Sequence, residues 1–353
     1  MKEIITEWRK FLKEGKTRPL KEIKSASAHE AGSSIGKILK KQINNAVKAY
    51  KIEKLIEDFS DWMEKGKKLS KQHTPITYEF IEGLAEGAEI KPDEAFGMWY
   101  EELWFAKEKD KTKLKDEGCT DVFVKDGDNV IMGHNNDERP GDGSRLIKLE
   151  IKNKPTIYAS FTRGVPSIGV NNVGLVFSGC QVDANDTTPG IPRMMLYMEA
   201  LFSKTLKEAE SLLLHPKRAS AFANVVSDET GKIITLEGSA EKEKKVNHKD
   251  GVDVHTNHFL WLKSKEGREG KSLKDSIKRL KKAIGMGEDL EEDMRIDKMK
   301  EILSSHGEGG LCRHTKDKNE SATVFSVIFL PTKRKFFYGD GNPCKTDYIE
   351  VNY

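Results

Sequence analysis

The chain has few cysteines and no long apolar run. Its four cysteines, Cys119, Cys180, Cys312 and Cys344, lie far apart and include no CxxC pair, which is too few for a disulfide framework in 353 residues. No run of ~20 apolar residues could span a membrane, and the start of the chain does not have the pattern of a signal peptide. We therefore expect a cytoplasmic, reduced protein with no membrane partner, in which a free thiol persists.

The chain also lacks an excess of charge of either sign. It carries 60 Lys and Arg against 57 Asp and Glu, a net charge of +3. A strongly basic surface is the usual footprint of nucleic-acid binding, so we expect no nucleic-acid partner and no polyanionic substrate. At ~150 residues per domain, the length allows one large domain or two smaller ones.

Residues 1–118 have the pattern of a helical N-terminal segment. Apolar residues recur near helical period among lysines and glutamates over residues 35–62, and Pro92 opens a further helix that carries several aromatic side chains. Packing in a core explains those aromatics. Residues 106–117 are highly charged with little to bury, which predicts an exposed linker at the end of the segment.

Short β-rich runs replace the helices after this linker. Residues 119–124 and 130–133 flank the turn signal Asp126-Gly127-Asp128-Asn129, which predicts a hairpin. Alternating strands and helices over 119–353 then indicate an α+β fold in which helix layers cover sheets. We expect strands over 146–151, 157–161, 174–177, 221–226, 233–237, 252–255, 323–330 and 335–338, and helices from about 192 to 201 and over 206–214, 271–284 and 289–303.

Gly118-Cys119 has the character of a site where a chain cuts its own backbone. The thiol would attack the preceding carbonyl, and water would open the resulting thioester, leaving Cys119 with a free α-amino group. Such an amine has a reference pKa of ~7.7–8.0, so one residue supplies both a nucleophile and a base. Asp137, 18 residues later at the end of the hairpin, could orient the ammonium. The alternative is a buried structural cysteine and a plain turn aspartate.

These residues carry a resemblance to a known family. Gly118-Cys119-Thr120 with Gly133-His134-Asn135-Asn136-Asp137 resembles the processing site of the acyl-CoA:6-aminopenicillanic-acid acyltransferase family, within the N-terminal nucleophile hydrolase superfamily. Further matches follow in the family's order at residues 82–88, 169–175, 190–193, 255–259, 311–314 and 341–344.

The resemblance implies an αββα four-layer sandwich with an N-terminal helical segment and cleavage between Gly118 and Cys119. It also implies that residues 1–118 and 119–353 stay associated, and that amide hydrolysis or acyl transfer proceeds through a thioester on Cys119. Cys119 matches the family's nucleophile, Asp137 the nearby aspartate, and Asn257 the asparagine of the oxyanion hole, whose loss typically costs ~10²–10³ in rate. The expected partner is a small acyl substrate, acyl-CoA among the candidates, and no cofactor is implied.

One departure concerns the substrate pocket. Where the family has an arginine shortly before the penultimate strand, this chain reads Lys318-Asn319-Glu320-Ser321. Arg313 is the nearest preceding arginine, and we name it with Asn172 as substrate-binding candidates. Penicillin chemistry is not expected from this pattern. Related bile-salt and acylamide hydrolases share the cysteine-to-aspartate pattern, so a linear amide fits as well.

Two other functions and a metal site are open alternatives. An unprocessed thiol protease would use Cys119 with His258 as its base, and a non-catalytic binding protein would keep Cys119 buried. His255, His258, Cys312 and His314 suggest a metal site, but tetrahedral sites usually draw on more closely spaced ligand pairs, so we expect no metal. Only the self-processing enzyme requires an attackable Gly118 carbonyl.

Overall fold

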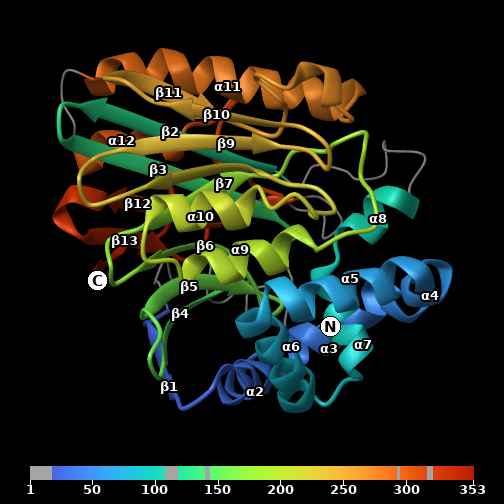
Figure 1. Cartoon of the computed structure of the whole chain (residues 1–353). Helices are drawn as coiled ribbons and strands as arrows, with labels where there is room; N and C mark the ends of the chain where they lie inside the picture. The colour runs from blue at the N-terminus through green and yellow to red at the C-terminus, as the bar shows by residue number, and fades with distance from the viewer. Residues whose placement is uncertain (1–17, 108–117, 140–143, 292–294, 316–320) are drawn as a thin grey trace.

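Two β-sheets lie face to face in the centre of the structure, a computed structural model that describes residues 18–107, 118–139, 144–291, 295–315 and 321–353 (Figure 1). The larger sheet has the order β1 (Lys21–Ser25), β4 (Ser144–Ile151), β5 (Ile157–Thr162), β6 (Val165–Asn171), β7 (Val176–Cys180), β8 (Ala223–Ser227), β9 (Ile233–Gly238) and β10 (Glu243–Asn247). The smaller sheet has the order β11 (Gly251–His255), β2 (Gly118–Asp126), β3 (Asn129–Glu138), β12 (Ala322–Leu330), β13 (Lys335–Gly339) and β14 (Ile349–Asn352).

Helices cover the outer face of each sheet (Figure 1). The smaller sheet is covered by α11 (Gly270–Glu291) and α12 (Ile296–Leu303). The larger sheet is covered by α9 (Arg193–Leu201) and α10 (Leu206–Leu213) together with helices of the N-terminal segment. Those helices are α2 (Ala28–Ile38), α3 (Lys40–Ala49), α4 (Ile52–Asp58), α5 (Ser60–His73), α6 (Pro75–Ala88), α7 (Pro92–Trp99) and α8 (Glu102–Lys107), and short 3₁₀ turns lie at Lys263–Lys265 and Pro331–Lys333.

Helices, two sheets and further helices are stacked in that order. Buried apolar side chains fill the space between each helical layer and its sheet, and the space between the two sheets. Phe123 and Met132 of the smaller sheet meet Leu146 and Val170 of the larger sheet in the central layer. Helices α11 and α12 pack on the outer face of the smaller sheet, and α2, α6 and α9 pack on that of the larger one. Alternating side chains of a strand point to opposite faces, so each sheet contributes to two layers. The expected α+β, four-layer αββα sandwich is confirmed.

The N-terminal segment is mostly helical, as predicted, but it also supplies a strand. Strand β1 pairs in parallel with β4 at the edge of the larger sheet. Helices α2 and α6 cross so closely that a Cβ atom at Gly32 would lie 1.9 Å from the Phe80 carbonyl oxygen, so only glycine fits there. Residues 108–117 of the predicted linker lie outside the described residues.

The predicted hairpin is the element that positions the site. β2 and β3 pair antiparallel from Gly118 opposite Asp137 to Asp126 opposite Asn129. Cys119, Asp121, His134 and Asn136 share the face toward the other sheet, because cross-strand partners lie on one face of a ladder.

Most remaining sequence-based elements agree with the structure, but the helices predicted over 271–284 and 289–303 are α11, which continues to Glu291, and α12, which begins only at Ile296. Strands β6, β10 and β14 were not predicted. Within the described residues, no helix is both long enough and apolar enough to cross a membrane.

Candidate active site

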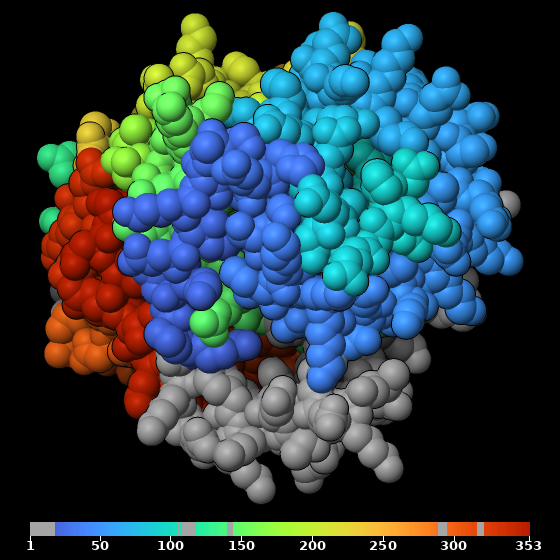
Figure 2. All heavy atoms as spheres, turned by 90° about the horizontal axis from the view of Figure 1, so that it is seen from below, coloured from blue at the N-terminus to red at the C-terminus, as the bar shows by residue number. Residues whose placement is uncertain are grey.

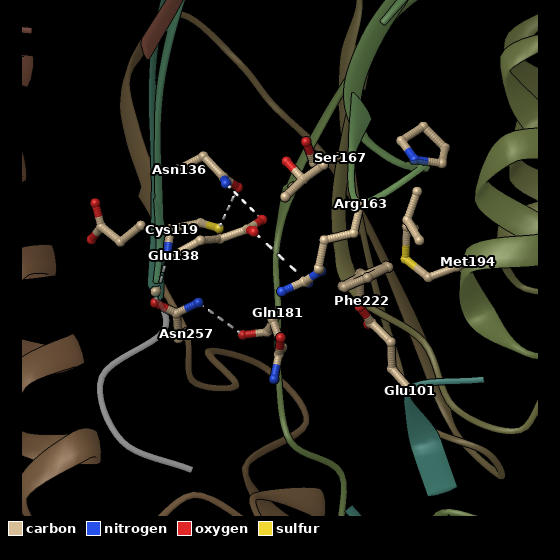
Figure 3. A pocket seen from close by; sticks show the side chains of 16 residues that line it. Glu101, Cys119, Asn136, Glu138, Arg163, Ser167, Gln181, Met194, Phe222 and Asn257 are labelled. Carbon is tan, nitrogen blue, oxygen red and sulfur yellow. Dashed lines mark hydrogen bonds and ion pairs between the residues drawn. The ribbon is translucent and has the colours of Figure 1, made fainter. Parts of the chain in front are cut away.

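Cys119 is half-buried at the start of β2 and lines a pocket between the two sheets (Figure 3). Its thiol lies 3.4 Å from Oδ1 of Asn136, and its backbone N–H donates to Oδ1 of Asn257 at 2.9 Å. The sulfur and the backbone nitrogen of the residue are therefore held by different partners.

Asn257 and Arg279 hold the backbone on both sides of Cys119. Arg279, on α11, donates from Nη2 to Oδ1 of Asn257 at 2.7 Å and from Nη1 to the Cys119 carbonyl oxygen at 2.6 Å. Two donors to Oδ1 identify it as the oxygen of the amide, so Nδ2 is the donor, bound to the Gln181 carbonyl at 3.1 Å. Asn257 lines the pocket and has the donor that an oxyanion hole needs.

Arg279 was not predicted from the sequence. It is one of many cations in a charged helix, and nothing local distinguishes it from its neighbours. Its burial beside Cys119 depends on how α11 packs against β2.

Asp137 lies opposite Gly118 in the hairpin and is fully buried. Thr323 donates to its Oδ1 at 2.7 Å, and Nε of Arg313 lies 3.0 Å from its Oδ2. Burial raises the pKa of the Asp137 carboxyl, while the charges of Arg313 and Arg279 oppose that rise. Arg313 thus contacts Asp137, and also Asp275, and is not among the residues that line the Cys119 pocket.

A buried polar cluster, also missed in the sequence, lies behind the Cys119 thiol. Nδ1 of His134 lies 2.9 Å from Oδ1 of Asp121, and Ser178 of the facing sheet donates to the same oxygen at 2.5 Å. Burial opposes the charged imidazole, but Asp121, with a smaller effect from Cys119, raises the pKa of His134 to about 10. Asp121 therefore favours the charged form of His134. The sequence signal for His134 was its position on the same face of the hairpin as Cys119.

The pocket has an apolar wall opposite the cysteine. Met194 and Phe222 lie across the pocket from Cys119, with the charged Arg163 and Glu101 on the same side (Figure 3). Nη2 of Arg163 lies 3.8 Å from Oε2 of Glu138. Because Glu101 precedes the predicted cleavage point, the N-terminal segment forms part of the pocket.

Two other sequence-based candidates lie elsewhere. Asn172 is exposed, its Oδ1 accepts from the Thr156 N–H at 3.0 Å, and it does not line the pocket. His258 faces the Ser276 hydroxyl at 2.8 Å, and burial, with the charges of His255 and Arg279, lowers its pKa to about 4. No hydrogen bond joins His258 to Cys119 in the described part of the chain, so no observation favours a Cys119–His258 protease.

Two stacked sheets between helical layers, with a cysteine at the start of an inner strand, are the architecture of the N-terminal nucleophile hydrolases. A family model described as acyl-coenzyme A:6-aminopenicillanic acid acyl-transferase matches residues 124–344. The match covers more than half of the chain, so the chain belongs to this family. Cys119 lies just before the matched residues.

The chain is also similar to individual proteins. The 40 kDa form of acyl-coenzyme A:6-aminopenicillanic-acid-acyltransferase from Emericella nidulans is 26% identical over 309 residues, which cover 84% of each chain. Among solved structures, a conjugated bile acid hydrolase from Clostridium perfringens matches with a TM-score of 0.40 and 12% identity, covering 67% of this chain and 97% of that one. Penicillin V acylase from Agrobacterium tumefaciens matches with a TM-score of 0.37 and 14% identity, covering 63% and 82%. The chain is an enzyme of the acyltransferase class that this family represents.

Proposed function

We propose that this protein is a self-processing cysteine enzyme that cuts its own chain between Gly118 and Cys119 and then hydrolyses or transfers the acyl group of a linear amide or acyl thioester. The observation that carries the proposal is the position of Cys119. Its thiol faces the pocket while Asn257 and Arg279 hold its backbone N–H and C=O.

Self-cleavage would begin with attack of the Cys119 sulfur on the Gly118 carbonyl carbon. The thiol proton passes to the departing Cys119 nitrogen as the C–N bond breaks, which leaves a thioester between Gly118 and the sulfur. Water then cleaves the thioester to a Gly118 carboxylate and a free Cys119 thiol. The Asn257 Oδ1 that accepts the amide N–H would accept equally from the new amine.

Catalysis on a substrate would repeat the same chemistry. The free α-amine of Cys119 takes the thiol proton, the sulfur attacks the substrate carbonyl, and the proton is returned to the leaving amine or thiol. The acyl group then sits on Cys119 as a thioester until water or an amine acceptor removes it. Asn257 would donate a hydrogen bond to the oxyanion. Asp137, held in place by Arg313, would keep a carboxyl group near the new amine.

The pocket supports an apolar acyl group as substrate. Met194, Phe222 and Val165 offer apolar surface across from the thiol, while Arg163 and Glu101 offer charges to a polar end group. An acyl-CoA is one candidate donor, because the relative from Emericella nidulans is named for acyl-coenzyme A. We also propose a cytoplasmic location, since all four cysteines are free thiols.

A panel of N-acyl amino acids and acyl-CoA esters tests the catalytic part of this proposal. We expect the wild-type protein to release acid or transfer the acyl group, and Cys119→Ala to be inactive. Asn257→Ala should lower kcat by ~10²–10³, as for loss of one oxyanion donor, whereas Asn247→Ala, exposed on β10, is the matched control and should retain activity. Turnover that survives Cys119→Ala would contradict the thioester mechanism.

A further inference from the structure

Four metal-ligating side chains converge on one point outside the Cys119 pocket. They are His306 after α12, Cys312 and His314 before β12, and Cys344 after β13. Their donor atoms all lie within 4.8 Å of one another. None of the four lines the pocket.

The separations between the donors are close to those of a tetrahedral shell. Nε2 of His306 and Nε2 of His314 are 3.0 Å apart, and the sulfurs of Cys312 and Cys344 are 3.6 Å apart. Nε2 of His314 lies 3.5 Å from the Cys312 sulfur and 3.2 Å from the Cys344 sulfur. Tetrahedral ligands lie about 1.6 bond lengths apart, so zinc bonds of ~2.0–2.3 Å require ~3.3–3.8 Å between donors. Small shifts of side chains suffice to reach that geometry.

We propose that His306, Cys312, His314 and Cys344 form a closed Cys2His2 site for a tetrahedral divalent metal ion, zinc in the cell. Two thiolates and two imidazoles are a donor set that favours zinc over harder cations such as magnesium or calcium. Four protein ligands fill the tetrahedron and leave no position for water or substrate, so the ion is structural. Three of the ligands are exposed, which lets an ion reach the folded protein.

The backbone around the cluster already holds these loops together. The Cys312 N–H donates to the Ser305 carbonyl at 3.0 Å, which joins the segment of Cys312 to that of His306. Nδ2 of Asn342 donates to the Arg313 carbonyl at 2.6 Å, which joins it to the segment of Cys344. The converging ligands are therefore a property of the fold and not of surface side chains alone.

The position of the cluster suggests what the metal would stabilise. Arg313 lies between the ligands Cys312 and His314 in the sequence, and its Nε pairs with Asp137 at 3.0 Å. A bound ion would fix the backbone on both sides of Arg313 and so hold that guanidinium against Asp137. The ion would take no part in the thioester chemistry itself and would act only by positioning Arg313 and Asp137 near Cys119.

The expectation of no metal came from a different set of residues. His255 pairs with Glu237 at 3.0 Å and His258 with Ser276 at 2.8 Å, so neither joins Cys312 and His314. In the structure, Cys312 and His314 lie instead beside His306 and Cys344.

Metal analysis of the full chain tests the proposal. Protein expressed with zinc supplementation and dialysed in reducing, metal-free buffer is expected to retain about one zinc per chain by elemental mass spectrometry. His306→Ala and Cys344→Ser, both exposed, should lower retained zinc about tenfold or more. Cys119→Ser and His29→Ala, outside the cluster, are matched controls and should retain the metal. Near-zero zinc in the wild type, or zinc unchanged in both ligand variants, would overturn the site.

Cobalt(II) substitution gives a second readout that does not depend on activity. Cobalt bound to the wild-type protein should show the visible absorption of tetrahedral coordination and a thiolate-to-cobalt charge-transfer band that weakens in Cys344→Ser. A Cys312–Cys344 disulfide in freshly purified protein, found by mass mapping after alkylation without reductant, would contradict the proposal.

Discussion

The sulfur and the backbone nitrogen of Cys119 meet two different polar environments. The sulfur shares its face of the β2–β3 hairpin with Asp121 and His134, and Asp121 favours the charged form of His134 by raising its pKa. The backbone nitrogen meets Asn257, and Asp137 lies opposite the preceding residue. A carboxylate near the nitrogen would suit an ammonium. The amine of the proposed nucleophile and base pair therefore has a carboxylate close by.

The buried His134–Asp121 pair should make stability depend on pH. Because the folded pKa of His134 is raised from 6.5 to about 10, its stabilisation is fully present below pH 6.5 and is lost as pH rises through about 10. We expect His134→Gln to lower the free energy of unfolding by ~3–5 kcal/mol near neutral pH. The difference in the free energy of unfolding between His134→Gln and its parent should become smaller above pH 10.

Urea unfolding of both proteins across this pH range measures the effect. Both proteins should carry Cys119→Ala, so that each is a single uncut chain. This substitution leaves Asp121 in place, which raises the pKa of His134 more than Cys119 does. His29→Gln, a half-buried histidine 3.4 Å from Glu86, is the control and should change stability by less than ~1 kcal/mol. If the difference in the free energy of unfolding stays constant up to high pH, His134 is not charged in the folded protein.

At the scale of elements, the start of β2 packs closely against α11 and the loop after β11. A Cβ atom at Gly118 would lie 3.0 Å from Nη2 of Arg279 on α11 and 3.0 Å from Oδ1 of Asn257. These are the same two groups that hold Cys119. The absence of a side chain at residue 118 thus lets the proposed scissile bond lie against them.

Gly118→Ala should therefore slow self-cleavage by about tenfold or more, because displaced reacting groups lose their alignment. The fraction of two-chain protein against time after synthesis, measured by denaturing electrophoresis, checks this. Gly285→Ala, on α11 itself and with no atom within 4 Å of the added carbon, is the control. Equal rates in the two variants would mean that the contacts of Gly118 do not matter for cleavage.

Elements set by local sequence could be predicted, and those set by distant packing could not. The β2–β3 hairpin follows from a turn signal between two apolar runs. Strand β6 was missed because Pro166 and Gly169 are typical of turns, whereas here they lie in a strand beside the irregular pairing at Ser160 and Phe161. Strand β1 exists only through β4, far along the chain.

The same distinction applies to side chains. Cys119, Asp137 and Asn257 were predicted, and the structure brings all three to the pocket. Arg279 reaches Cys119 across 160 positions in the sequence, and His306 meets Cys344 only because two loops converge. Neither contact has a local pattern.

At the scale of the whole molecule, the N-terminal segment is part of the enzyme. Its residues, blue to cyan, cover much of one face beside C-terminal residues in red (Figure 2). Phe80, Trp99 and Tyr100 belong to the same core as Phe161 of the larger sheet. The Glu102 carboxylate accepts from the Arg193 N–H at 2.9 Å, across the proposed cut. A cut at Gly118 would thus leave two chains that share a sheet, a core and a pocket.

Intact-mass analysis of the native protein tests the central claim most directly. A single peak from size-exclusion chromatography under native conditions should contain two masses, one ending at Gly118 and one starting at Cys119 with a free α-amine. The Cys119→Ala protein should give one full-length mass. A wild-type protein that is fully active as one uncut chain would contradict the account.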